Sequence, residues 1–143
     1  MATPCIVLDT NVLVAALRSS LGASYKVLSE VGTGRFDISI SVPLVLEYED
    51  ALKRQIVDLP HLNERDVDDL LDLLCRVGQR QHVFYLWRPA LRDPNDDLVL
   101  ELGVAARSDA IVTHNLRDFR GADQFGIEVV SPREFLARLE TRK

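Results

Sequence analysis

A short apolar run that ends at an acid limits the possible fold of this chain more than any other stretch: Cys5-Ile-Val-Leu8, followed by Asp9. Four consecutive apolar residues without alternation are typical of a strand buried on both faces, as in a parallel sheet covered by helices. The next apolar run, residues 12–17, is compatible with a helix that has Thr10 or Asn11 as its N-cap. Asp9 therefore follows the carboxyl end of a buried strand, where open α/β sheets bind their ligands. A second role for Asp9, as a helix cap alone, stays open at this point.

The composition predicts one globular domain over residues 1–143, with 47% hydrophobic and 27% charged residues. No apolar run approaches the roughly 20 residues of a membrane span, and no signal-peptide pattern precedes the first strand, so we expect a cytoplasmic protein. The net charge of −5 argues against an extensive nucleic-acid-binding surface but permits a local basic groove. Cys5 and Cys75 stand apart from any CxxC or Cys/His grouping, so we interpret them as buried apolar residues.

Strand-like and helix-like segments alternate along the rest of the chain. Residues 36–41 alternate with period two, and Ser41 and Pro43 then predict the start of a helix over 42–57. Ser131-Pro-Arg-Glu134 has the form of a capping box. Further helices are predicted over 23–31, 63–77, 98–106 and 135–139, and further strands over 81–87, 110–113 and 127–130. This alternation predicts a three-layer α/β/α sandwich with a mostly parallel central sheet.

Several acids occupy unusual places on these segments. Asp9 follows the first strand, Glu47 lies inside the helix after the second, and Asp96 and Asp97 open the helix before the strand at 110–113. The carboxyl ends of parallel strands face one edge of the sheet, so these acids can converge there, and Asp118 reaches the same edge. Carboxylates that converge without basic partners repel one another, and a divalent cation removes that repulsion. Mg²⁺ or Mn²⁺ in such a site supports hydrolysis of a phosphodiester.

Each acid taken singly has an ordinary structural explanation, because Asp9 and Asp97 are plausible caps and Asp118 a plausible loop acid. Glu47 discriminates between the two interpretations, since it is flanked by Leu46 and Tyr48 in an apolar stretch. The sequence contains no nucleophile elbow beside its three histidines, no GxGxxG and no Walker pattern. Serine-hydrolase and nucleotide-loop chemistry are therefore disfavoured.

With these residues assembled, the chain resembles the PIN-domain nucleases, in particular bacterial PIN-family toxins of toxin–antitoxin systems. The matching segments are Val7-Leu-Asp-Thr-Asn-Val-Leu13, Ser41-Val-Pro-Leu-Val-Leu-Glu-Tyr48, Asp93-Pro-Asn-Asp-Asp97 and Ile111-Val-Thr-His-Asn-Leu-Arg-Asp-Phe119. The resemblance implies a PIN-like fold and a metal-dependent endoribonuclease whose acids hold Mg²⁺ or Mn²⁺. It also implies a cognate antitoxin protein as a partner, and a homodimer.

The resemblance implies a role for each acid that matches the family pattern. Asp9 matches the first acid, Glu47 the second and Asp97 the third, and these three are expected to hold the metal. Asp96 is the competing assignment for the third acid. The catalytic set expected from the resemblance is completed by Asp118.

The resemblance also implies supporting polar residues around the acids. Asn11 and Thr113 match the residues that orient the acids and the bound water. The family's fourth acidic position is Asn115 here, which favours Asp118 as the fourth contributor and weakens a second metal position.

Basic residues are expected to hold the RNA backbone near the same edge, although each could also be a solvated surface charge. The candidates are Arg18, Lys53, Arg54, Arg88, Arg92 and Arg117. Two other functions are weighed: a catalytically inactive PIN domain that binds a protein partner, and a Mg-dependent phosphatase of the haloacid-dehalogenase type. The phosphatase pattern DxDxT fails, because Asn11 and Leu13 stand at its second and third positions.

Overall fold

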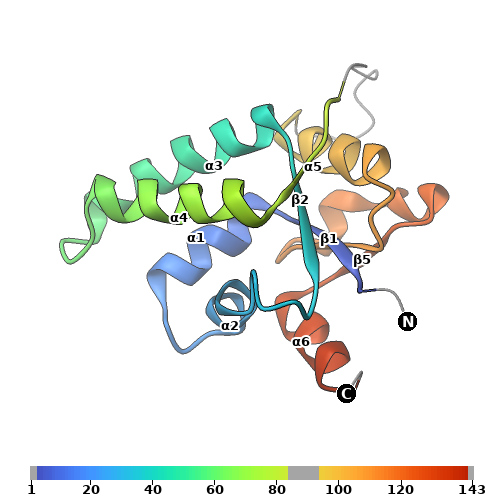
Figure 1. Cartoon of the computed structure of the whole chain (residues 1–143), viewed down its shortest axis with the longest axis horizontal. Helices are drawn as coiled ribbons and strands as arrows, with labels where there is room; N and C mark the ends of the chain where they lie inside the picture. Colours follow the sequence, from blue (N-terminus) through green and yellow to red (C-terminus); the bar gives the residue numbers. More distant parts are fainter. Residues whose placement is uncertain (1–2, 84–93, 142–143) are drawn as a thin grey trace.

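Five strands form one parallel sheet among the residues that the computed structural model describes, which are 3–83 and 94–141. The sheet order is β3-β2-β1-β4-β5, so the first strand lies at the centre (Figure 1). The strands are β1 (Cys5–Leu8), β2 (Asp37–Ile40), β3 (Gln79–Arg80), β4 (Ala110–Val112) and β5 (Glu128–Val130). Every pairing described is parallel. The predicted α/β sandwich is confirmed, with a sheet that is parallel throughout.

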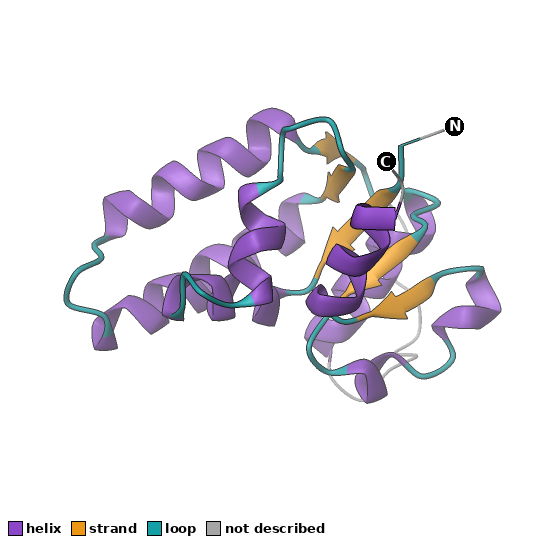
Figure 2. Ribbon diagram, turned by 90° about the horizontal axis from the view of Figure 1, so that it is seen from below, coloured by secondary structure: helices purple, strands orange, loops and turns teal. Residues whose placement is uncertain are grey.

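Helices flank both faces of this sheet (Figure 2). They are α1 (Thr10–Arg18), α2 (Ala23–Ser29), α3 (Val42–Gln55), α4 (Glu64–Val77), α5 (Pro94–Ala105) and α6 (Pro132–Thr141). Short 3-10 helices also lie between them in the described part of the chain: η1 (Ile56–Asp58), η2 (Leu116–Phe119) and η3 (Ala122–Phe125). Helix α5 packs on β1, β2 and β4, and α3 and α4 lie side by side as a pair that projects away from the sheet (Figure 1). No helix among the described residues is long and apolar enough to cross a bilayer.

Local capping explains where several helices begin. The Ser41 hydroxyl accepts a hydrogen bond from the first turn of α3 at 3.3 Å, as its sequence position predicts. Asn63 and Asp66 form a reciprocal capping box at α4, with distances of 3.1 and 2.9 Å. At α6 only half of the predicted capping box forms. Ser131 Oγ accepts from the Glu134 N–H at 3.1 Å, while the Glu134 carboxylate binds a side chain one turn later.

The third strand differs from the prediction of a strand over 81–87. β3 consists of Gln79–Arg80, residues 81–83 follow it outside the strand, and residues 84–87 lie outside the described residues. The reason is Gly78, which ends α4 with extended backbone at φ −74° and ψ 150° and directs the chain beside β2 at once. A side chain at this position would have its Cβ 2.6 Å from the Leu74 carbonyl oxygen.

The two cysteines are free thiols, as predicted, but both are half-buried rather than buried. Cys5 is the first residue of β1, and the end of a strand is less enclosed than its middle. The Cys5 Sγ lies 3.1 Å from Ser39 Oγ. The next residues of β1, Ile6 and Val7, are fully enclosed. The predicted burial of the first strand is therefore confirmed beyond its first residue.

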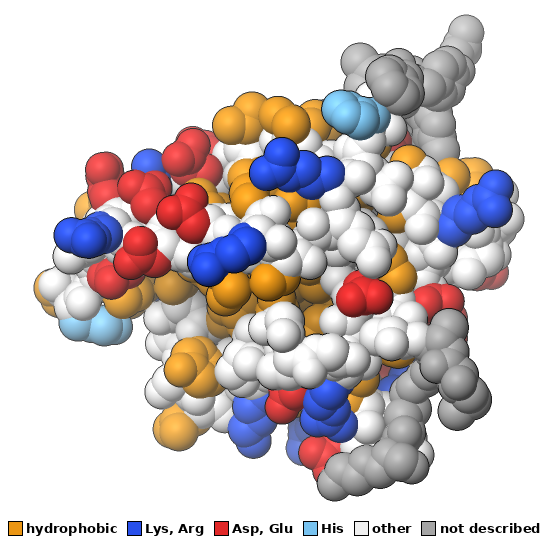
Figure 3. All heavy atoms as spheres, viewed as in Figure 1, with side chains coloured by type: hydrophobic (Ala, Val, Ile, Leu, Met, Phe, Trp, Pro, Cys, Tyr) orange, Lys and Arg blue, Asp and Glu red, His pale blue; other side chains and the backbone are white. Residues whose placement is uncertain are grey.

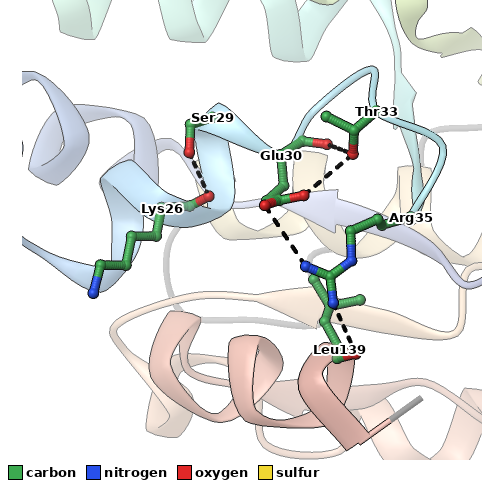
Figure 4. A network of polar contacts seen from close by, with 6 residues as sticks. All are labelled: Lys26, Ser29, Glu30, Thr33, Arg35 and Leu139. Atoms are coloured by element: carbon green, nitrogen blue, oxygen red, sulfur yellow. Dashed lines mark hydrogen bonds and ion pairs between the residues drawn. The ribbon is translucent and has the colours of Figure 1, made fainter. Parts of the chain in front are cut away.

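Arg35 joins the loop after α2 to the last helix (Figure 4). It precedes β2 and therefore lies opposite the carboxyl ends of the strands, which form the carboxyl edge of the sheet. Its Nη2 donates to the Leu139 carbonyl oxygen at 2.9 Å, and its Nη1 lies 3.6 Å from a Glu30 carboxylate oxygen. Thr33 Oγ1 donates to the Glu30 carbonyl oxygen at 2.7 Å. The guanidinium thereby satisfies a carbonyl group near the end of α6 that the helix itself leaves without a donor.

We expect Gly78→Ala to lower the free energy of unfolding by about 1–3 kcal/mol. The new methyl group would meet the Leu74 carbonyl oxygen and lie 3.1 Å from the Ile40 side chain, so α4 and β2 would have to separate. Gly22→Ala is the matched control, since its nearest contact would be an ordinary 3.9 Å. Urea unfolding of both variants checks this, and equal stabilities would contradict it.

Candidate active site

The order of the strands creates one switch point, between β1 and β4. The chain proceeds from β1 to β2 and β3 on one side, and then returns to place β4 and β5 on the other. In open parallel sheets such a switch opens a crevice at the carboxyl ends of the two strands. Asp9 follows β1 and Thr113 follows β4, so both residues stand at this switch point, at the carboxyl ends of the strands. Their backbone N–H groups extend the ladder, donating to the Val112 and Val130 carbonyl oxygens at 2.9 Å.

Asp9 and Thr113 bind each other directly at this switch point. The Thr113 hydroxyl donates to Asp9 Oδ2 at 2.7 Å, and the two residues are 0% and 7% exposed respectively. Asp9 occupies the N-cap position of α1 but makes no capping bond with its side chain. The helix begins at Thr10, so the prediction of Thr10 or Asn11 as N-cap is wrong. The Asp9 carboxylate accepts from Thr113 and makes no side-chain bond to its own helix, which disfavours a capping role.

Thr113 is the hub of a small hydrogen-bond network. Besides donating to Asp9, its Oγ1 accepts from the Asn115 backbone N–H at 3.0 Å and from Asn11 Nδ2 at 3.4 Å. Asn11 Oδ1 in turn accepts from the His114 N–H at 3.2 Å. The first turn of α1 and the loop after β4 are therefore fixed around one carboxylate. The structure brings together Asp9, Asn11 and Thr113 of the predicted site, with Asn115 contributing through its backbone.

Tyr48 fixes α3, and with it Glu47, to the end of β1. Its buried hydroxyl donates to the Leu8 carbonyl oxygen at 2.5 Å. That carbonyl lies beyond the last residue pair of β1 with β2, Ile6 with Ile38, so the side chain supplies a bond that the ladder does not. Burial, and then the nearby Asp9 charge, raise the pKa of Tyr48 far above its ordinary value, so the hydroxyl stays a donor. Glu47, half-buried, precedes it on α3.

Helix α5 carries two buried acids. Asp97 and Glu101 are each 8% exposed, and their spacing of one turn places them on the same side of the helix. Asp96 is more exposed than Asp97, so burial favours Asp97 as the third acid. Sequence reasoning missed Glu101. The signal was present, because Glu101 stands between Leu100 and Leu102 as Glu47 stands between apolar neighbours.

Asp118 lies apart from the hydrogen-bond network around Thr113. It is exposed on η2, and within the described residues its carboxylate has no hydrogen bond or ion pair, while its N–H donates to the Asn115 carbonyl oxygen at 3.0 Å. Its assignment as the fourth catalytic acid stays a prediction.

The predicted RNA-binding residues separate into three groups. Lys53 forms ion pairs with acids of α3 and α4 at 3.1 and 3.3 Å, and these bonds raise its pKa. Arg54 pairs with an acid of α3 at 3.0 Å, and Arg18 donates to Gln55 at 2.6 Å. These three lie at the distal ends of helices that start at the carboxyl edge. Arg117 is exposed on η2, beside the edge itself. Arg88 and Arg92 lie outside the described residues.

The donor chemistry of this edge fits a hard divalent cation. Asp9, Glu47, Asp97 and Glu101 offer carboxylate oxygens, which Mg²⁺ and Mn²⁺ prefer over the nitrogen and sulfur ligands of zinc sites. Within residues 3–83 and 94–141, no three His, Cys, Asp or Glu side chains are gathered as a formed metal cluster. The assignment of the metal ligands therefore stays a prediction.

A comparison with protein families identifies the domain. A family model described as a PIN domain matches residues 5–117, which include β1, α3, α5 and β4. PIN domains are typically nucleases and generally use divalent metal ions. A search of curated proteins finds no match.

We expect Tyr48→Phe to lower the free energy of unfolding by about 1–3 kcal/mol at neutral pH, because the Leu8 carbonyl oxygen loses its buried donor. The pKa of Tyr48 is raised in the folded protein, so the hydroxyl stabilises the fold below the ordinary tyrosine pKa of 10.0. Above that pH the unfolded chain ionises first, and the advantage of wild type over Tyr48→Phe should shrink by about 1.4 kcal/mol per pH unit.

Urea unfolding at pH 8 and pH 11 measures this difference. Tyr25→Phe, at an exposed tyrosine of α2, is the control and should show neither effect. A difference between wild type and Tyr48→Phe that is the same at both pH values would contradict the assignment.

Proposed function

Because the chain belongs to the PIN-domain family, we propose that it is an endoribonuclease that hydrolyses RNA phosphodiester bonds with Mg²⁺ or Mn²⁺. One observation carries this proposal: the buried Asp9 carboxylate, held by Thr113 at the switch point between β1 and β4. A capping role would require a side-chain bond to α1, which Asp9 does not make, and an apolar core position would not require a buried carboxylate. The acids of α3 and α5 support the proposal, because both helices pack against each other and α5 also packs on β1.

The chain's own residues have distinct tasks in this proposal. Asp9, Glu47 and Asp97 would hold the cation, and the burial of Glu101 makes it a further candidate ligand. Thr113 keeps the Asp9 carboxylate in one orientation through its 2.7 Å hydrogen bond. The cation, when bound, supplies Lewis acidity for the scissile phosphate and lowers the pKa of a bound water. Asp118 would orient the attacking water, because the Thr113 hydroxyl donates its one hydrogen to Asp9 and accepts two hydrogen bonds from Asn115 and Asn11.

The charge distribution supports an RNA path along the carboxyl edge and not over α3 and α4. The surface of α3 and α4 is rich in acids, and its basic residues are partly neutralised by them (Figure 3). The exposed acids there are Asp50, Glu64, Asp66, Asp68, Asp69 and Asp72. A polyanion would be repelled by that surface. The loop after β4, with exposed Arg117, carries the better-placed positive charge.

The resemblance to PIN-family toxins supports a biological setting for this activity. In that setting the chain is the toxin of a toxin–antitoxin pair in the cytoplasm, with a cognate antitoxin protein as its inhibitor and a homodimer as its assembly.

If the chain is a toxin, expression of the wild type in a bacterial host is expected to slow growth, and expression of Asp9→Asn is not. Equal growth of both strains would contradict the toxin role while leaving the nuclease role intact.

We expect Asp9→Asn and Glu47→Gln each to lower Mn²⁺-dependent RNA cleavage at least about a hundredfold, with unchanged circular dichroism. The loss should be this large because residues that only support metal ligands already cost about 10- to 100-fold when removed. Asp72→Asn, at an exposed acid of α4, is the matched control and should keep wild-type activity. No metal-dependent cleavage by the wild type across a broad RNA panel would refute the proposal and favour an inactive protein-binding module.

The third acid can be identified by a separate comparison on α5. We expect Asp97→Ala to abolish cleavage, Asp96→Ala to retain most of it and Glu101→Gln to weaken it, in line with the burial of these side chains. Full activity in Asp97→Ala together with loss in Asp96→Ala would show that the third acid is Asp96.

A further inference from the structure

His114 connects the Asp9–Thr113 network to helix α2. It directly follows Thr113, and its backbone N–H donates to Asn11 Oδ1 at 3.2 Å. Its imidazole Nε2 lies 2.6 Å from the hydroxyl oxygen of Ser24, in the first turn of α2. Ser24 is 3% exposed, whereas His114 is exposed. A buried hydroxyl thus holds one nitrogen of a ring that faces solvent beside the candidate active site.

The hydrogen bond to Ser24 determines which nitrogen of the ring carries the proton. Among the described residues, the Ser24 hydroxyl has no partner other than His114. A buried hydroxyl hydrogen needs an acceptor, so Ser24 donates to Nε2. The proton of the neutral imidazole then resides on Nδ1, which has no hydrogen-bond partner in the part of the chain described. The ring is anchored at one nitrogen and offers an N–H group at the other.

This N–H group belongs to the loop that follows β4, beside the candidate active site. His114 is one residue beyond the Thr113 hydroxyl that binds Asp9, and exposed Arg117 follows on η2 of the same loop. A fixed N–H donor and a guanidinium on the same loop suit the nonbridging oxygens of a phosphodiester. Neither group is paired with an acid of the described chain, unlike Lys53 and Arg54.

We propose that His114 is a substrate-binding residue, which donates its Nδ1–H to an RNA phosphate next to the scissile bond, and that Ser24 is the positioning residue for its ring. This inference rests on the proposed ribonuclease function. The competing role is structural, with the imidazole serving only to tie α2 to the end of β4. The two nitrogens of the ring allow the two roles to be separated.

Two amide variants separate them. His114→Gln can place an amide at the position of Nε2 and keep the bond to Ser24, but it loses the Nδ1 donor. His114→Asn can place an amide N–H near the position of Nδ1, but it loses the bond to Ser24. A structural role requires RNA affinity to follow stability across these variants. A substrate-binding role requires the two to diverge.

The experiment measures kcat and KM for Mn²⁺-dependent cleavage of a labelled single-stranded RNA, together with the Tm of each variant. We expect His114→Ala and His114→Gln to raise KM about tenfold, with kcat within about threefold of wild type. His114→Gln should keep the wild-type Tm, while His114→Asn should have a lower Tm but a smaller rise in KM. Ser24→Ala should raise KM less than His114→Ala.

His61→Ala, at an exposed histidine between α3 and α4, is the control and should keep the wild-type KM. Wild-type KM in His114→Gln, with a raised KM in His114→Asn, would overturn the inference in favour of a structural tie. Unchanged KM in every His114 variant of an active enzyme would overturn it as well and leave the ribonuclease intact. Absence of RNA cleavage by the wild type would refute the inference together with the proposed function.

Discussion

The hydrogen bond from Thr113 to Asp9 is the interaction on which the candidate site depends. A carboxylate that is 7% exposed is costly to bury without a donor, and the Thr113 hydroxyl supplies one at 2.7 Å. The bond links the ends of β1 and β4, the two strands on either side of the switch point. Asn11 and the Asn115 backbone hold the hydroxyl in turn. A geometry shared by two strands and one helix is thereby fixed around a single acid.

Tyr48 extends this rigidity to the helix that carries Glu47. Its hydroxyl binds the carbonyl oxygen of Leu8, the residue directly before Asp9, and so fixes α3 beside the end of β1. Helix α5, which carries the buried Asp97 and Glu101, packs on β1 and α3 from the other half of the chain. The acids therefore reside on elements that the core orders, which is the condition for a preorganised site. In the proposed function, the acid-rich surface of α3 and α4 would repel RNA, and the carboxyl edge would be the side that RNA approaches.

Sequence reasoning succeeded where local chemistry decides the outcome. The apolar run Cys5–Leu8 was enough to predict a central strand, and Ser41 and Asn63 were enough to predict two helix starts, because each signal acts over a few residues. β3 was misplaced because a two-residue strand is determined by Gly78 and by pairing with β2, and not by its own periodicity. Asp9 was predictable from its position after a strand, whereas the role of Thr113 was expected only from the resemblance to PIN-domain nucleases. The contact of Ser24 with His114 was not, since it joins residues 90 positions apart.

The most direct measurement is the anomalous diffraction of a crystal of the wild-type protein soaked in Mn²⁺. Ligands drawn from Asp9, Glu47 and Asp97 require an anomalous peak at the carboxyl edge between β1, α3 and α5. The same soak of Asp9→Asn should show that peak weakened or lost. A wild-type crystal with no peak at this edge, or with peaks only among the exposed acids of α4, would contradict a metal centre built on Asp9.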